Sequence, residues 1–171
     1  MSKNEITFLV VLIAIVWTFA AVNLLQSQIL ARDIQRKNDL KHIATALNDY
    51  LKEVGSYPSS RDGKLLSCFD SSKNLRSCEW GQDALESTTS AYIKPLPEDP
   101  LEHQGKNFYV YLSNTRNFQI FTYLERQDDD EFNKKVEERN ISCGINSICN
   151  FGVASGSVDP ATDLGSYTGD F

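Results

Sequence analysis

Residues 6–25, ITFLVVLIAIVWTFAAVNLL, decide how this chain of 171 residues is organised. Two threonines and one asparagine are the only polar side chains in this stretch, and no charged residue lies between Glu5 and Arg32. At about 1.5 Å per residue, a helix of this length spans roughly 30 Å, the thickness of a bilayer hydrocarbon core. The sequence therefore predicts a membrane-spanning helix at its N-terminal end.

A removable secretory signal is the alternative interpretation of this stretch. Such a signal has an apolar segment of about 7–15 residues, followed by small residues at a cleavage site. Here Trp17, Phe19 and Leu24 extend the apolar block beyond that length, and residues 26–29 follow without a helix-breaking residue. We therefore expect a retained membrane anchor.

The composition of the chain argues against a protein that binds nucleic acid by neutralising phosphates. The chain carries 17 basic and 23 acidic side chains, for a formal charge of -6. No basic cluster is denser than the pair Arg36 and Lys37, whereas that kind of binding needs a basic patch. We divide the chain into an N-terminal anchor helix, residues 1–31, and a head, residues 32–171, which includes the amphipathic half of the helix and has the size of one domain.

The cysteines and the basic residues give opposite indications of topology. More basic residues follow the anchor than precede it, which would place the following residues in the cytoplasm. All four cysteines also follow the anchor, in two locally spaced pairs, as is typical of disulfides in an oxidising space. Three connectivities are possible, four reduced thiols are an alternative, and the spacings are unlike those of zinc motifs. We favour a head outside the cytoplasm, with Cys68 paired to Cys78 and Cys143 paired to Cys149.

A single helix is predicted from about residue 6 to residue 54. The first glycine is Gly55 and the first proline is Pro58, so no earlier residue obliges the helix to stop. In its second half, apolar side chains recur at three- and four-residue intervals, and charged residues such as Arg36 and Lys37 are expected on the solvated faces. The apolar stripe expected to pack on the head comprises Ile34, Leu40, Ile43, Leu47, Leu51 and Val54.

The head is predicted to be of the α+β class. Residues 59–82 are rich in small polar residues and indicate a loop, and residues 82–93 are predicted to form a short helix that ends before Pro95. Residues 107–112 and 117–124 have the composition of strands, and the turn-forming residues between them predict a hairpin. The face of the second strand expected to pack on the helix carries Phe118, Ile120, Thr122 and Leu124.

The last third of the head is predicted to be rich in loops. Asp128, Asp129 and Asp130 precede Val136, and we expect them to cap a short helix at its positive end. From residue 140 onward there is no basic side chain, and five of the nine glycines lie there. We expect loops with one or two strands, held by the second cysteine pair.

Several motifs together resemble the type IV pilin family, most closely the branch that includes the major pseudopilin of type II secretion systems. Glu5 stands directly before the apolar block, and Tyr57 and Pro58 follow it at the interval of a processed pilin. The resemblance covers residues 5–125. The other matching pieces are Asn23, Leu24, RKNDL at 36–40, Ala46, Leu47, Tyr50, Gly55, Ser56, LPEDP at 96–100, the aromatic hairpin and YLE at 123–125.

This resemblance implies the type IV pilin fold, in which a long N-terminal helix packs on a small antiparallel sheet. The implied function is that of a structural subunit of a type IV pilus, used for adhesion, twitching motility or DNA uptake. One alternative is the major pseudopilin of a type II secretion or competence pseudopilus, and another is a monomeric membrane-anchored binding module. The implied partners are copies of the chain, the inner-membrane pilus assembly machinery, prepilin peptidase and, before assembly, the membrane. The implied final location is a cell-surface filament.

Glu5 and Met1 are the residues expected to act in assembly. A carboxylate beside an apolar helix costs several kcal/mol if it is buried without a partner. In a filament, Glu5 can pair with the N-terminal amine of a neighbouring copy and so set the axial register. The alternative is a solvated carboxylate beside Lys3 at the membrane face.

The first residues depart from the family pattern. Residues 1–4, MSKN, stand where pilins usually have Phe-Thr-Leu-Ile, so Met1 is either a processed N-terminus or an initiator. Ala14 and Val22 stand where the family commonly has glycine and proline. We therefore expect a more continuous helix in this segment than in assembled pili.

No catalytic constellation is recognisable in the sequence, and we expect neither enzymatic activity nor a cofactor. His42 and His103 are isolated and support neither a metal site nor a general base. Calcium is a weak possibility, because the pseudopilin branch can bind it near the C-terminus, but the ordered EF-hand loop is missing. Helix capping and solvated loops are the alternative roles for the candidate ligands, which are Asp128, Asp130, Asp159 and Asp163, with Asp129 and Asp170 as further oxygen donors.

Overall fold

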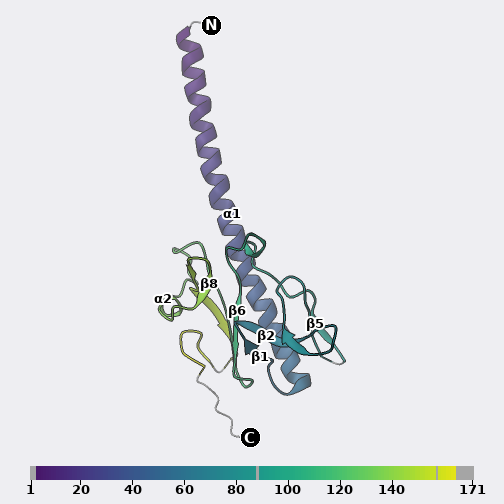
Figure 1. The fold of residues 1–171 in the computed structure, drawn as a ribbon. Coiled ribbons are helices and arrows are strands. Elements are labelled where there is room, and N and C mark those ends of the chain that lie inside the picture. The colour runs from purple at the N-terminus through teal and green to yellow at the C-terminus, as the bar shows by residue number, and fades with distance from the viewer. Residues whose placement is uncertain (1–2, 88, 157, 165–171) are drawn as a thin grey trace.

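Helix α1 (Lys3–Val54) forms the axis of the molecule, and a small head packs against its C-terminal half (Figure 1). The computed structural model describes residues 3–87, 89–156 and 158–164, apart from the side chain of residue 6. The 52 residues of α1 run without interruption through Ala14 and Val22, as predicted, and reach roughly 78 Å. The architecture is α+β, with one long helix and small antiparallel sheets.

Gly55 ends α1. Its φ of 84° lies in the left-handed region that favours glycine, and its N–H donates to the Leu51 carbonyl at 2.8 Å. Two residues later, the Tyr57 N–H donates to the carbonyl of Thr115 at 2.8 Å. The chain therefore turns away from the helix at Gly55, and the hydrogen bond of Tyr57 joins it directly to the head.

The C-terminal half of α1 buries one stripe of side chains in the head. Leu40, Ile43 and Leu47 are fully buried and pack in one cluster with Phe118 and Ile120. The predicted packing of the helix on this strand is therefore confirmed. Burial of one such aliphatic side chain contributes about 1.5–3 kcal/mol, so the stripe is a main source of cohesion between helix and head.

The buried stripe differs from the prediction at both ends. Ile34 and Val54 are exposed, whereas Arg36, expected on a solvated face, is fully buried together with Asp33. The buried positions 33, 36, 40, 43 and 47 follow one another at three- and four-residue intervals, so they share one side of the helix. The head covers that side of the helix from residue 33 onward, so the charged side chains of Asp33 and Arg36 are buried along with the apolar ones.

The main sheet has the strand order β10–β7–β6 and is antiparallel throughout. Its strands are β6 (Val110–Ser113), β7 (Phe118–Thr122) and β10 (Phe151–Ala154). The predicted hairpin is therefore confirmed in kind, with shorter strands. All of β7 is buried, because α1 covers one face and a second apolar cluster around Phe121 and Val136 covers the other.

A second small sheet lies where the sequence predicted a loop over residues 59–82. It consists of β1 (Ser59–Arg61), β2 (Lys64–Phe69) and β3 (Leu75–Ser77), with β2 in the centre. The disulfide between Cys68 and Cys78 ties β2 to the residue after β3, with 5.1 Å between the Cα atoms. The polar composition concealed the strands because their side chains are only partly buried.

The helix predicted over residues 82–93 is wrong. This segment contains β4 (Leu85–Glu86) and β5 (Ala91–Ile93), which pair antiparallel. The Ser87 N–H donates to the Ser90 carbonyl, and the Ser90 N–H donates to the Ser87 hydroxyl. These local bonds give the backbone an alternative to helical hydrogen bonding, which explains the turn.

The rest of the head contains short elements. They are the 3₁₀-helix η1 (Glu102–Gln104), the helix α2 (Lys134–Glu137) and the hairpin of β8 (Ser142–Gly144) and β9 (Ser147–Ile148). The second disulfide, between Cys143 and Cys149, closes this hairpin. The tail after residue 140 therefore has the expected loops and disulfide, but its described part contains three strands, β8, β9 and β10, where one or two were expected.

The cap of α2 is not the predicted run of aspartates. The side chain of Asn133 accepts hydrogen bonds from the N–H groups of Lys135 and Val136 and is the N-cap. Asp128 and Asp129 instead bind Arg126 and Lys37, respectively. The helix begins four residues later than Asp130, which places these carboxylates beyond the reach of its first turn.

Candidate functional site

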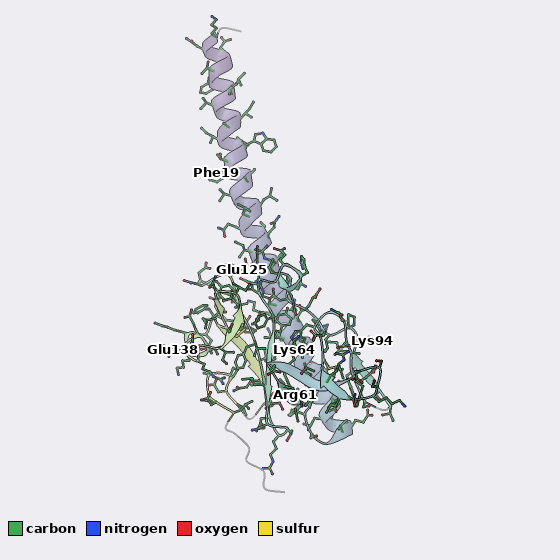
Figure 2. The ribbon with its side chains drawn as sticks, viewed as in Figure 1. Phe19, Arg61, Lys64, Lys94, Glu125 and Glu138 are labelled. Carbon is green, nitrogen blue, oxygen red and sulfur yellow. A yellow bond between two sulfur atoms is a disulfide. The ribbon has the colours of Figure 1, made fainter. Side chains whose placement is uncertain are left out.

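The most unusual surface of the molecule is residues 3–28 of α1, here called the bare half. Every side chain described in it is exposed. Trp17 is 72% exposed and Phe19 is 74% exposed, and Figure 2 shows side chains projecting from this part of the helix on all sides, far from the head. By length and composition, α1 is able to cross a membrane. An apolar surface of this size requires an apolar partner.

Four polar side chains within the bare half form hydrogen bonds to the backbone of the same helix. Each donates to a backbone carbonyl one turn earlier, at 2.8–3.1 Å. Such bonds allow a polar side chain to enter an apolar environment without an unsatisfied donor. The five bonds run from Thr7 to Lys3, from Thr18 to Ala14 and Ile15, from Asn23 to Phe19, and from Ser27 to Asn23.

Of the two residues expected to act in assembly, only Glu5 is described. It lies exposed in the first turn of α1, where the positive end of the helix dipole favours a carboxylate. Met1 lies outside the described residues. The site is therefore defined by the bare half, with Glu5 at its free end.

Where α1 enters the head, the buried guanidinium of Arg36 lies at the centre of a cluster of charged side chains. Its Nε and Nη2 donate to the two carboxylate oxygens of Asp99 at 2.7 and 3.2 Å. Its Nη1 donates to Asp33 at 2.8 Å and to Glu125 at 2.7 Å. We call Arg32, Asp33, Arg36, Asp99 and Glu125 the ionic collar.

The ionic collar joins the three sequence motifs 36–40, 96–100 and 123–125. Glu125 also accepts hydrogen bonds from Arg32, at 2.7 and 2.6 Å. The Asp33 carboxylate accepts the backbone N–H groups of Glu125 and Arg126, each at 3.0 Å. Figure 2 places Glu125 at the top of the head, beside the helix. The collar therefore attaches α1 to the loop after β7 and to the loop before η1.

The collar is electrostatically self-consistent. Burial disfavours the ionised Glu125, but hydrogen bonds from Arg32 and Arg36 outweigh it and lower the pKa of that carboxyl. Burial also opposes the charge on Arg36, and the bonds to Asp99 and Glu125 more than compensate, so the pKa of Arg36 is raised. The lowered pKa of Glu125 and the raised pKa of Arg36 both favour the charged forms, and a buried ion network needs its charges paired in this way to be stable.

A second contact of the same kind lies at Lys37, one turn along α1 from Asp33. Lys37 is within 2.9 Å of Asp129 and 3.0 Å of Glu131. Burial alone would lower the pKa of Lys37, but the hydrogen bonds that its ammonium donates to these two carboxylates outweigh burial, and the net shift is upward. The helix is thus fixed to the head by charges on two successive turns.

The calcium candidates do not come together. Asp128 binds Arg126 at 2.9 Å, Asp163 binds Arg139 at 2.9 Å, and the Asp159 side chain accepts the Ala161 N–H at 2.8 Å. Within residues 3–87, 89–156 and 158–164, no group of three or more potential ligands is arranged to hold a metal ion. Asp130 is exposed, and Asp170 lies outside the described residues.

Sequence reasoning missed the collar, although one signal for it was present. Asp33 and Arg36 are spaced from each other and from Leu40 by three and four residues, so they continue the buried stripe toward the N-terminus. Their partners Asp99 and Glu125 are 63 and 89 residues from Arg36, and no local pattern joins them.

Comparisons of the chain with protein-family models, with curated proteins and with solved structures find no match. Its function therefore has to be argued from the bare half, the ionic collar and the head.

Proposed function

We propose that this chain is a structural subunit that polymerises into a type IV pilus filament. The observation that supports this most strongly is the bare half, a fully exposed apolar helix continuous with one embedded in a head. The bare half is stored in the inner, or cytoplasmic, membrane and later lies in the core of the fibre. The extracellular filament is the final location.

The two environments of the bare half are similar in energy. Lipid tails and a bundle of identical apolar helices both exclude water, so transfer between them changes little net hydrophobic free energy. The internal hydrogen bonds of Thr7, Thr18, Asn23 and Ser27 are kept in both environments. A subunit can therefore leave the membrane without exposing a new unsatisfied polar group.

The ionic collar gives the subunit a fixed shape for polymerisation. A regular filament needs the same angle between core helix and head in every copy, because that angle sets the position of each neighbour. Arg36 contacts three carboxylates from α1 and two separate loops, so rotation of the head about the helix would break buried ion pairs. The collar therefore favours one orientation.

The free end of the bare half is the proposed register site. Glu5 lies at the margin of the apolar surface, and pairing with the N-terminal amine of a neighbouring copy would remove the cost of burying its charge. This role requires Met1, or the residue exposed by processing, to carry a free or methylated amine. Prepilin peptidase and the inner-membrane assembly machinery are the partners that such a subunit needs.

The two disulfides support a head outside the cytoplasm. Both join residues close in sequence, with separations of 10 and 6. Disulfides of this kind persist in oxidising compartments and are rare in the cytosol. The orientation proposed is therefore with the free end of the bare half toward the cytoplasm and the head outside.

The proposal is tested by isolating the assembled protein and imaging it by electron microscopy. We expect filaments made of this chain, with the bare halves packed together along the fibre axis, and an intact mass that identifies the N-terminal residue. Short fibres that require a secretion machine would indicate a pseudopilus. Protein that stays monomeric in membranes under all conditions would contradict polymerisation and indicate a membrane-anchored binding module.

A further inference from the structure

The head carries an isolated apolar side chain at the end that faces the bare half. Ile145, in the turn between β8 and β9, is 72% exposed. Its N–H donates to the carbonyl of Lys106 at 2.9 Å, which fixes the turn and places Lys106 beside it. Ile145 lines the same hollow, of about 590 Å³, as Ile29 and Arg32 of α1, so it lies next to the ionic collar.

The opposite end of the head carries an apolar groove, here called the distal groove. Val54 at the end of α1, Phe69 of β2 and Leu75 of β3 line a hollow of about 560 Å³. Phe69 is 64% exposed and Leu75 is 49% exposed. Figure 1 shows that the C-terminal end of α1 lies at the end of the head away from the bare half. The exposed isoleucine and the groove therefore lie at opposite ends of one head.

Charges beside these two surfaces are complementary. Lys106 is exposed next to Ile145, and Glu86 lines the distal groove. Glu53, near the groove, accepts hydrogen bonds from the hydroxyls of Thr89 and Ser87. The bond from Thr89 contributes most to lowering the pKa of Glu53 to about 2, so this carboxylate is ionised at neutral pH. An acidic rim around an apolar groove matches a basic side chain beside an apolar one.

We infer that Ile145 of one copy occupies the distal groove of the next copy, with Lys106 facing Glu86. This inference rests on the proposed polymerisation and names the contact between heads. Because the two surfaces are different and lie at opposite ends, the contact is head-to-tail and repeats without closing, which is the kind of interface that builds an open filament.

The contact sets a stagger that agrees with the length of the bare half. Two copies joined by this contact are displaced by about one head, which α1 spans in residues 29–54, roughly 38 Å at 1.5 Å per residue. The bare half, residues 3–28, spans roughly the same length. The bare halves of two copies joined by this contact therefore follow one another along the fibre axis, whereas the neighbour whose N-terminal amine pairs with Glu5 is a different copy that lies between them in the bundle.

Disulfide trapping in assembled filaments tests the contact. All four native cysteines are already in disulfides, so introduced thiols have no native partner. Filaments of the double variant Ile145→Cys with Leu75→Cys should give a ladder of covalent multimers after mild oxidation. The matched control pairs Ile145→Cys with Asn38→Cys, an exposed position on α1 that does not line the groove, and should give no ladder.

The outcomes separate this inference from the proposed function. Filaments that form normally but give no ladder with Leu75→Cys would overturn the contact and leave polymerisation intact. Failure of the unmodified chain to polymerise would overturn both. Dimers trapped by Ile145→Cys alone would indicate a symmetric contact and would also overturn the inference.

Charge reversal gives an independent measurement. In the double-cysteine background, Lys106→Glu should slow trapping roughly fivefold, the change that corresponds to loss of an exposed ion pair of about 1 kcal/mol. Adding Glu86→Lys should restore the rate, because the pair is re-formed with opposite orientation. Equal slowing by both single reversals without recovery in the combination would contradict the pairing of these two residues.

Discussion

The two halves of α1 have the same secondary structure but opposite relations between polarity and burial. In the bare half, apolar side chains such as Trp17 and Phe19 are exposed. In residues 29–54, the embedded half, the charged side chains of Asp33 and Arg36 are fully buried. Each half contains what a soluble globular protein avoids, an apolar surface in one and a buried charge in the other.

This difference shows which half is complete within one molecule. The buried charges of the embedded half are matched by Asp99 and Glu125, so its interactions are made inside the subunit. The apolar side chains of the bare half have no comparable cover within the described residues. The bare half therefore depends on an external partner, whereas the embedded half should fold with the head alone.

The largest effect is expected from Arg36→Ala, which breaks the embedded half. Removing the guanidinium leaves Asp33 and Asp99 buried without their main partner, which typically costs about 3–5 kcal/mol of unfolding free energy. Urea unfolding of the head in detergent, followed by circular dichroism, measures this loss. The control Lys41→Ala removes an exposed pair with Glu131 and should cost less than about 1 kcal/mol. Equal losses would contradict the role of burial.

The next effect is expected from Val16→Lys, which breaks the bare half. A lysine near the centre of a membrane helix costs about 2.5–3.5 kcal/mol. The ratio of membrane-inserted to soluble chain should therefore fall roughly a hundredfold, while unfolding of the head is unchanged. Membrane fractionation after an alkaline wash measures the ratio. Asn38→Lys, an exposed position in the embedded half, is the control and should leave the ratio unchanged.

Loss of the disulfide in the β8–β9 hairpin should affect only the head. Replacing Cys143 and Cys149 by alanine opens a loop with a sequence separation of 6, and the loop-entropy estimate is about 2 kcal/mol. Membrane insertion of the bare half should not change. Unfolding and insertion measured on the same preparation would reveal any coupling, and a parallel loss of insertion would contradict the independence of the two halves.

The smallest effect is expected from Glu102→Gln, which changes how the stability of the head depends on pH. Burial raises the pKa of Glu102 to about 7, and its buried Oε2 has no hydrogen-bond partner among the described residues. Between about pH 4.5 and pH 7, the Glu102 carboxyl is therefore protonated in the folded head but ionised in the unfolded chain. The free energy of unfolding consequently falls as pH rises through that range. Glu102→Gln should stabilise the head by about 1 kcal/mol at pH 8 and have little effect at pH 4.

The collar has the opposite pH dependence and serves as the reference. The pKa of Glu125 is lower in the folded head than in the unfolded chain. Its ion pairs therefore add to the free energy of unfolding above the unfolded-state pKa, and this stabilisation is lost as pH falls below about 4.5. A stability profile of the wild type should therefore decline on the acid side, and Glu102→Gln should alter only the neutral and alkaline side. A shift of the acid limb in that variant would contradict this assignment.

The sequence predicted the elements whose cause is local. The helix over 3–54 follows from the absence of glycine and proline before Gly55, and the hairpin containing β6 and β7 follows from its aromatic runs and turn residues. The cysteine pairing favoured by local spacing is also the pairing in the structure. Each of these features is determined by residues close in sequence.

The features that sequence reasoning missed depend on distant residues or on competing local bonds. The burial of Arg36 depends on Asp99, 63 residues away, so a solvated position was the natural expectation. The segment 82–93 has helix-compatible residues, but the mutual hydrogen bonds of Ser87 and Ser90 favour a turn between two short strands. Asn133 displaced the aspartates as the cap because the helix starts later than their position suggests.

The position of the ionic collar has a mechanical consequence. In the proposed fibre, tension along the core passes into each head through the point where α1 enters it. There Asp33 accepts hydrogen bonds from two backbone N–H groups, and Arg36 forms a bidentate ion pair with Asp99. A pull along the helix therefore acts on several buried ionic bonds at once, so the head is expected to resist separation from α1 at this point.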